Sequence, residues 1–143
     1  MGLPVVIKIG VLIERRGMLL LIEEKKDEKS SYKFNIVKGT FDAKDKSFER
    51  TAVRESLEEA GVEIKVKKLF NSFVVKRSDQ TIVQLNFLAS FVKSRSLSKN
   101  KEIENEYIGK ASFFQKGQLL KMREEDFINK RAYQSVKKWV AER

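Results

Sequence analysis

Apolar and polar positions along the chain predict a series of strands interrupted by one charged helix. Val5 to Ile13 is nearly unbroken in β-branched and apolar residues, which is typical of a strand buried on both faces. Further strands are predicted over residues 18–22, 32–37, 62–66, 69–75, 81–92 and 111–114. The run over 81–92 alternates well and places one set of apolar side chains on a single face, namely Val83, Leu85, Phe87, Ala89 and Phe91.

Two helices and one short helical turn are expected between and after these strands. Ser47 is the expected N-cap of a helix from about Phe48 to Ala60, and Gly61 supplies the left-handed position that ends it. A turn is predicted over 118–122, and residues 124–142 carry apolar side chains at helical spacing, with Trp139 as a core anchor. This order of elements favours a mixed sheet covered by helices on both sides, a small α/β (α+β) domain over 1–143.

The first helix gathers three carboxylates on one side. At ~100° per residue, Glu58 lies about 60° to one side of Glu55, and Glu59 lies about 40° to the other side. Like charges at this spacing repel, and a bound cation would relieve the repulsion, so we suspect a metal site here. The opposite side of the helix, which we expect to pack against the sheet, carries Val53, Leu57 and Ala60.

Composition limits the chemistry that this site can use. The 143 residues include no Cys and no His, which excludes disulfides, thiolate or imidazole metal ligands, and a cysteine nucleophile. Carboxylate oxygen remains, and it favours hard cations, Mg²⁺ or Mn²⁺. The chain has no run of 18 apolar residues and no signal-peptide pattern at its N-terminus, so we expect a cytoplasmic protein without a membrane span.

The formal net charge is +10, from 30 Lys and Arg against 20 Asp and Glu. A solvated basic surface explains this charge, and so does attraction for polyphosphates or nucleic acid. The basic, serine-rich loop over 93–101 is open to the same two interpretations, a surface connection or a phosphate-facing flap. Charge alone does not separate them.

The charged helix and the glycine before it resemble the signature of the Nudix hydrolases, G-x5-E-x7-R-E-U-x-E-E-x-G-U, in which U is aliphatic. The matching residues are Gly39, Arg54, Glu55, Glu58, Glu59, Gly61 and Val62. Ser56 stands where the aliphatic residue is usual. The first glutamate of the signature is missing, because counting from Gly39 reaches Asp45 and counting back from Arg54 reaches Lys46.

The resemblance covers essentially the whole chain and implies the α/β/α sandwich of the Nudix fold, with a mixed sheet. It implies metal ligands at Glu55, Glu58 and Glu59, with the carbonyl of Lys38 or Gly39 as a backbone ligand. Arg54 would orient the carboxylates through charge-assisted hydrogen bonds. The general base stays open between Glu58 and Glu106, with Asp45 as a weaker candidate.

The activity that the resemblance implies is hydrolysis of the diphosphate linkage in a nucleoside diphosphate joined to another moiety, with Mg²⁺ or Mn²⁺ as cofactor. The expected partner is a small-molecule nucleotide, and a homodimer is left open. The alternatives are a Nudix-fold module that binds a nucleotide or RNA without cleaving it, and an enzyme that acts on RNA 5′ ends. The isomerase branch of the superfamily relies on a cysteine, which this chain lacks.

Overall fold

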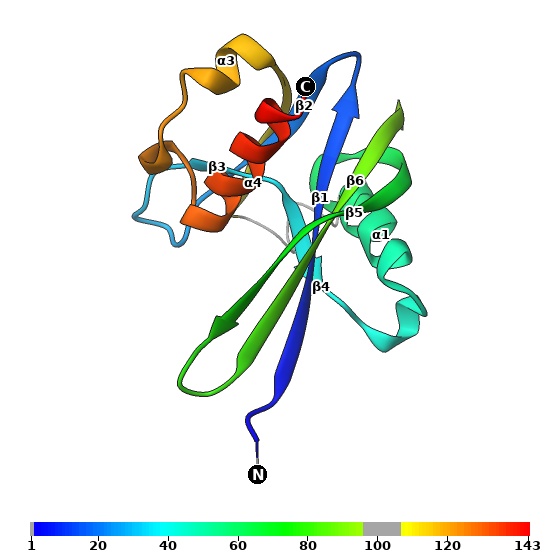
Figure 1. The fold of residues 1–143 in the computed structure, drawn as a ribbon, viewed down its shortest axis with the longest axis vertical. Helices are drawn as coiled ribbons and strands as arrows, with labels where there is room; N and C mark the ends of the chain where they lie inside the picture. The colour runs from blue at the N-terminus through cyan, green and yellow to red at the C-terminus, as the bar shows by residue number, and fades with distance from the viewer. Residues whose placement is uncertain (1, 96–106) are drawn as a thin grey trace.

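The computed structural model describes residues 2–95 and 107–143, and Figure 1 shows their arrangement. The strands are β1 Val5–Arg15, β2 Met18–Glu24, β3 Lys33–Asn35, β4 Val37–Thr40, β5 Val62–Lys76, β6 Thr81–Ser94 and β7 Ile108–Gln115. The helices are α1 Phe48–Ala60, α3 Lys116–Leu120 and α4 Lys130–Ala141, with short 3-10 helices at Ala43–Asp45 (η1) and Glu124–Asp126 (η2).

The described strands form one mixed sheet, as predicted. Its order is β3-β2-β1-β6-β5, while β4 pairs with β1 and β7 pairs with β2. β1 and β6 run parallel from Val5 opposite Thr81 to Glu14 opposite Ser90, and the other strand pairs are antiparallel. β5 is one continuous strand where two were predicted, because register shifts within its pairing to β6 absorb the irregular positions.

Two apolar cores lie on opposite faces of this sheet. Figure 1 shows α1 on one side of the sheet, and α3 and α4 on the other. On one face, alternate residues of β1 and β6 such as Ile9, Val11 and Phe87 pack with Ala52 of α1. On the other face, Leu12 and Leu88 pack with α3 and α4. The alternation predicted for β6 is confirmed for Leu85, Phe87, Ala89 and Phe91, which lie in the α1 core, while Leu88 between them faces α4. Val83, the first member of the predicted set, is half-buried and belongs to neither core.

The predicted ends of α1 are confirmed. The Ser47 hydroxyl accepts a hydrogen bond from the Arg50 N–H at 3.1 Å, as an N-cap does. Gly61 has φ 66°, and its N–H bonds to the Leu57 carbonyl at the end of the helix. These two capping contacts determine where α1, the helix that carries the acidic side chains, begins and ends.

The predicted packing face of α1 is only partly correct, because Ala60 packs against the core on this side of the sheet and Val53 does not. Val53 is 40% exposed, whereas Thr51, Ala52, Glu55 and Ser56 are buried. The helix is rotated so that the side chain of Glu55 points toward β4 rather than into solvent. Contacts of α1 with β4, β5 and β1 determine this rotation. The spacing of apolar residues within the helix does not predict these contacts.

The C-terminal region packs as predicted, although its helix is shorter. α4 begins at Lys130 after the N-cap Asn129, and Ile128 lies ahead of it in the same core. Trp139 is fully buried, and its indole Nε1 donates to Glu14 at 2.7 Å, which confirms its role as a core anchor. Within residues 2–95 and 107–143, no helix is long and apolar enough to cross a membrane.

Candidate active site

Glu55 lies against the backbone of β4. A Cβ built on Gly39 would be 1.3 Å from Glu55 Oε2, so the carboxylate occupies the space that any other residue would fill with a side chain. Glu55 is 9% exposed, which is rare for a glutamate unless its charge is paired. Glycine at position 39 is therefore required by close approach of the acidic helix.

Glu59 contacts the same strand one residue earlier. Its Oε1 accepts a hydrogen bond from the backbone N–H of Lys38 at 3.0 Å. The Lys38 side chain projects from the other face of β4. Burial lowers its pKa, and the charges of Arg131 and Lys8 act in the same direction, while the charges of Glu24 and Glu59 oppose them. Glu55 and Glu59 thus place two carboxylates at Lys38–Gly39, the dipeptide whose carbonyls were predicted as backbone ligands.

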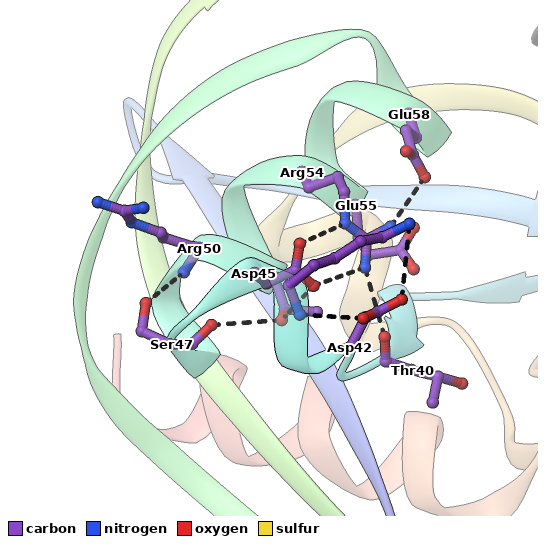
Figure 2. Close-up of polar contacts among 10 residues, drawn as sticks. Thr40, Asp42, Asp45, Ser47, Arg50, Arg54, Glu55 and Glu58 are labelled. Carbon is purple, nitrogen blue, oxygen red and sulfur yellow. Dashed lines mark hydrogen bonds and ion pairs between the residues drawn. The ribbon is translucent and has the colours of Figure 1, made fainter.

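Arg54 connects the acidic side chains to the preceding loop (Figure 2). Its Nε and Nη2 donate to the two Asp45 oxygens, each at 2.9 Å, in a bidentate pair. Nη1 donates to Glu58 Oε2 at 3.2 Å and lies 3.7 Å from Glu55 Oε1. The Asp45 hydrogen bond is the main cause that raises the Arg54 pKa, against desolvation by burial, so the guanidinium stays charged. The predicted orienting role of Arg54 agrees with this geometry.

The structure also answers which residue replaces the missing glutamate of the signature. Asp45 is that residue, since it binds Arg54 on two atoms and also accepts from Thr51 Oγ1 at 2.9 Å. These contacts, the Arg54 hydrogen bond first, lower the Asp45 pKa to about 2. A carboxylate with such a low pKa, whose oxygens already accept hydrogen bonds, is a poor general base. Asp45 is better described as the partner of Arg54.

Lys46 lies away from the acidic cluster. It adopts a left-handed conformation with φ 68°, directly after the 3-10 helix Ala43–Asp45, and its side chain is exposed. Within the described residues its side chain has no ion pair. The two ways of counting along the signature differ by one residue, and of the two residues that they reach, Asp45 contacts Arg54.

Ser56, the other departure from the signature, is fully buried. Its hydroxyl has no hydrogen-bond partner among the described residues, although the side chain is surrounded by protein. A buried hydroxyl without a partner is unfavourable, and the aliphatic residue usual at this position would avoid the penalty.

An open depression of about 380 Å³ lies beside these residues. It is lined by Thr40, Phe41, Asp42, Lys44, Arg54, Glu55 and Glu58. Glu58 is more accessible than Glu55, with 41% of its side chain exposed against 11%. Water and substrate therefore reach Glu58 more easily than Glu55.

The donor set fits a hard divalent cation in type and position. Glu55 and Glu59 bring carboxylate oxygens to the same two residues of β4, and oxygen ligands are those that Mg²⁺ and Mn²⁺ prefer. In residues 2–95 and 107–143, however, no three acidic side chains are grouped closely enough to form a complete metal site. Glu106, predicted as a further ligand or base, lies outside the described residues.

Comparison with known proteins identifies the family. The family model described as the NUDIX domain matches residues 5–136, and the chain therefore belongs to the Nudix family. No curated protein matches the sequence. The domain and its structural neighbours support the predicted class of enzyme, a Nudix-type phosphoanhydride hydrolase.

Solved structures agree with the fold. A Nudix hydrolase from Nitrosomonas europaea has a TM-score of 0.76 at 19% identity, over 97% of this chain and 90% of that one. A MutT protein from Methanosarcina mazei Go1 has a TM-score of 0.70 at 16% identity, over 99% and 96%. An ADP compounds hydrolase has a TM-score of 0.71 at 19% identity, over 96% and 74%. The predicted mixed sheet with helices on both faces is confirmed.

Proposed function

We propose that this protein is a metal-dependent hydrolase that cleaves the diphosphate linkage of a nucleoside diphosphate joined to another moiety. The observation that carries the proposal is the meeting of α1 and β4. There the carboxylates of Glu55 and Glu59 reach Gly39 and the Lys38 N–H. Carboxylates held at the backbone of β4, beside an arginine that is itself fixed by a bidentate pair with Asp45, suit phosphoanhydride chemistry, which depends on neutralising phosphate charge.

Glu55, Glu58, Glu59 and the Gly39 carbonyl would hold Mg²⁺ or Mn²⁺. A cation there neutralises charge on the phosphates and lowers the pKa of a bound water, which supplies the nucleophile. Use of divalent metals is general among Nudix hydrolases, so the family agrees with the donor set.

The side chains of this protein have separate tasks in the proposal. Arg54 fixes the orientation of Glu58 and Glu55, and Asp45 fixes Arg54 in turn. Glu58, the accessible carboxylate beside the depression, is a candidate base as well as a ligand, and Glu106 remains the other candidate base. The name of one structural neighbour, an ADP compounds hydrolase, is compatible with a nucleoside diphosphate derivative as substrate.

The experiment is a panel of nucleoside triphosphates, ADP-ribose, nucleotide sugars and dinucleoside polyphosphates, assayed for phosphate and nucleotide release with Mg²⁺ or Mn²⁺. We expect turnover on at least one class, its loss in EDTA, and its loss in Glu59→Gln. Glu49→Gln is the matched control, because Glu49 lies exposed in the first turn of the same helix.

Equal activity of Glu59→Gln and Glu49→Gln would contradict the assignment of the acidic face. No turnover on any compound, with nucleotides still raising the melting temperature, would identify the alternative, a binding module without hydrolysis.

A further inference from the structure

The face of the sheet opposite α1 carries a polar strip beside α4. Lys38 of β4 pairs with Gly10 of β1, and Gly10 pairs in turn with Asn86 of β6. In the next row, Thr40 pairs with Lys8, and Lys8 pairs with Gln84. Their chain neighbours Ile9, Val37, Leu85 and Phe87 face the α1 core, so these polar side chains project to the α4 face.

The floor of this strip is a fixed amide network. Asn86 is fully buried, and its Oδ1 accepts from Gln84 Nε2 at 2.9 Å. Asn86 Nδ2 donates to Asn71 Oδ1 at 2.9 Å and to Ser135 Oγ of α4 at 3.2 Å. A Cβ on Gly10 would lie 2.0 Å from Asn86 Oδ1, so the glycine lets the amide lie across β1. The network ties the strip to α4.

Three basic side chains border this floor. Lys38 and Lys8 project from adjacent rows, and Lys8 Nζ donates to Thr40 Oγ1 at 2.6 Å. Arg131 lies in the first turn of α4, and its backbone carbonyl accepts from Ser135 Oγ at 2.9 Å, so the amide network joins the turn of α4 that carries Arg131. Arg131 Nε is buried and has no hydrogen-bond partner among the described residues. Within those residues none of the three cations forms an ion pair.

Such an arrangement is unfavourable for the protein alone. Burial lowers the pKa of Arg131, and the charge of Arg77 lowers it further. A buried guanidinium N–H without an acceptor loses hydration with no compensating bond. An anion that accepts from Arg131 and lies near both lysines would satisfy the donor and neutralise the repulsion.

The position of the strip indicates which anion. Lys38 and Gly39 are consecutive, so the cations lie on one face of β4 and the carboxylates of α1 lie on the other. Among the described strands β4 pairs only with β1, so its other edge is not covered by a strand. A chain of linked phosphates that crosses this edge would meet acidic residues on one side and basic residues on the other.

We propose that Lys8, Lys38 and Arg131 form a phosphate-binding site on the α4 face of β4, which holds a phosphate group of the substrate other than the one at the carboxylates. The proposal rests on the proposed function for the identity of the ligand, and not for the existence of the anion site. Asn86 and Ser135 are positioning residues, because their hydrogen bonds join the floor of the strip to α4, the helix that carries Arg131.

The first test is metal-free binding of inorganic pyrophosphate, measured by calorimetry in EDTA. We expect binding to the wild-type protein, and a loss of affinity of at least about tenfold in Arg131→Gln and in Lys38→Gln, since each removes a charge-assisted contact. Lys130→Gln is the matched control, because it removes the same charge from an exposed neighbour on α4. A thermal melt of each variant separates lost binding from lost folding, and Lys8→Gln provides a third variant at a less buried position.

Two results would overturn the proposal: no pyrophosphate binding by the folded wild-type protein, or equal weakening by Lys130→Gln and Arg131→Gln. Glu59→Gln separates this proposal from the hydrolase itself, because the variant should lose turnover and keep metal-free pyrophosphate binding. With an active substrate, Arg131→Gln should raise KM by about tenfold and change kcat little, since the contact is made with bound substrate as well.

Discussion

The sharpest prediction concerns Asp45, the residue that replaces the missing glutamate of the signature. Asp45→Asn keeps the shape of the side chain but removes its charge and one of the two oxygens that accept from Arg54. Two charge-assisted bonds of 2.9 Å and the Thr51 hydrogen bond are weakened together. Arg54 then has Glu58 and Glu55 as its remaining acidic partners, and it would pull them from the positions that they hold now.

The expected loss of metal-dependent turnover in Asp45→Asn is about 10–100-fold, the usual effect of removing a group that orients metal ligands. Lys46→Glu is expected to change turnover by no more than about twofold, as for an exposed surface substitution. The left-handed Lys46 directs its side chain to solvent, so a carboxylate introduced there does not reach Arg54. The double variant Asp45→Asn/Lys46→Glu should therefore be as impaired as Asp45→Asn alone.

The assay is kcat and KM on the best substrate of the panel at saturating Mg²⁺ or Mn²⁺, with Asp79→Asn as a control at the exposed β5–β6 turn. Restoration of activity by Lys46→Glu in the Asp45→Asn background would refute the reasoning. It would mean that residue 46 occupies the signature position and that Asp45 does not.

Stability against pH gives an independent check of the same contact. The Asp45 pKa falls from 3.8 to about 2 on folding, so its contribution is fully present above the unfolded value and is lost as the pH falls through the folded value. The stability difference between wild type and Asp45→Asn should be constant above about pH 5 and shrink between about pH 4 and pH 2. A difference that does not change over this range would contradict the geometry.

The remaining predictions test buried positions around the site. Ser56→Ala should raise the free energy of unfolding by about 1 kcal/mol in urea titration, since it removes a buried hydroxyl without a partner. Ser135→Ala, at an equally buried serine, should lower it by about 1–3 kcal/mol because Asn71 and Asn86 both donate to its hydroxyl; a stabilised Ser135→Ala would contradict this contrast. Gly39→Ala should reduce turnover more than tenfold, with the melting temperature recorded beside it, because its Cβ would displace Glu55; unchanged turnover would mean that Glu55 is not needed there.

Features determined by local interactions could be predicted from the sequence. The ends of α1 follow from Ser47 and Gly61, whose capping contacts involve only residues of the same helix. The two faces of β6 follow from strict alternation along one strand. The acidic face of α1 follows from the spacing of its three glutamates, and the glycine before it from the signature.

Features determined by tertiary contacts could not be predicted from the sequence. The burial of Glu55 and the exposure of Val53 reverse the expectation from apolar periodicity, because α1 packs its edge onto β4 and places the carboxylate over Gly39. The pairing of Asp45 with Arg54 depends on a left-handed residue in the loop, and counting alone reached both Asp45 and Lys46. Counting from Gly39 reaches Asp45, the residue that binds Arg54. The conformation of the loop is needed to choose Asp45 over Lys46.

The polar strip next to α4 had a sequence signal that was easily missed. Val5 to Ile13 reads as an apolar run, yet Lys8 and Gly10 interrupt it two residues apart, on the same face of β1. A strand buried equally on both faces has no reason to place a charge and a glycine there. Polar residues or glycines that interrupt an apolar strand two residues apart indicate that part of one face of the strand does not pack in the apolar core.

The placement of charges about β4 also explains how an acidic site persists in a chain with net charge +10. Lys38 adjoins the site in sequence, but alternation sends its side chain to the α4 face. Its backbone N–H donates to Glu59, and the Glu59 charge only partly offsets the effect of burial, which lowers the pKa of the Lys38 ammonium. Arg54 is aligned by Asp45 and reaches Glu58 from the side. The lysine that adjoins the site is thus kept on the face of β4 opposite to the acidic residues. Substituting Lys38 should therefore change the affinity for phosphate, while Glu59 keeps its contact with the backbone.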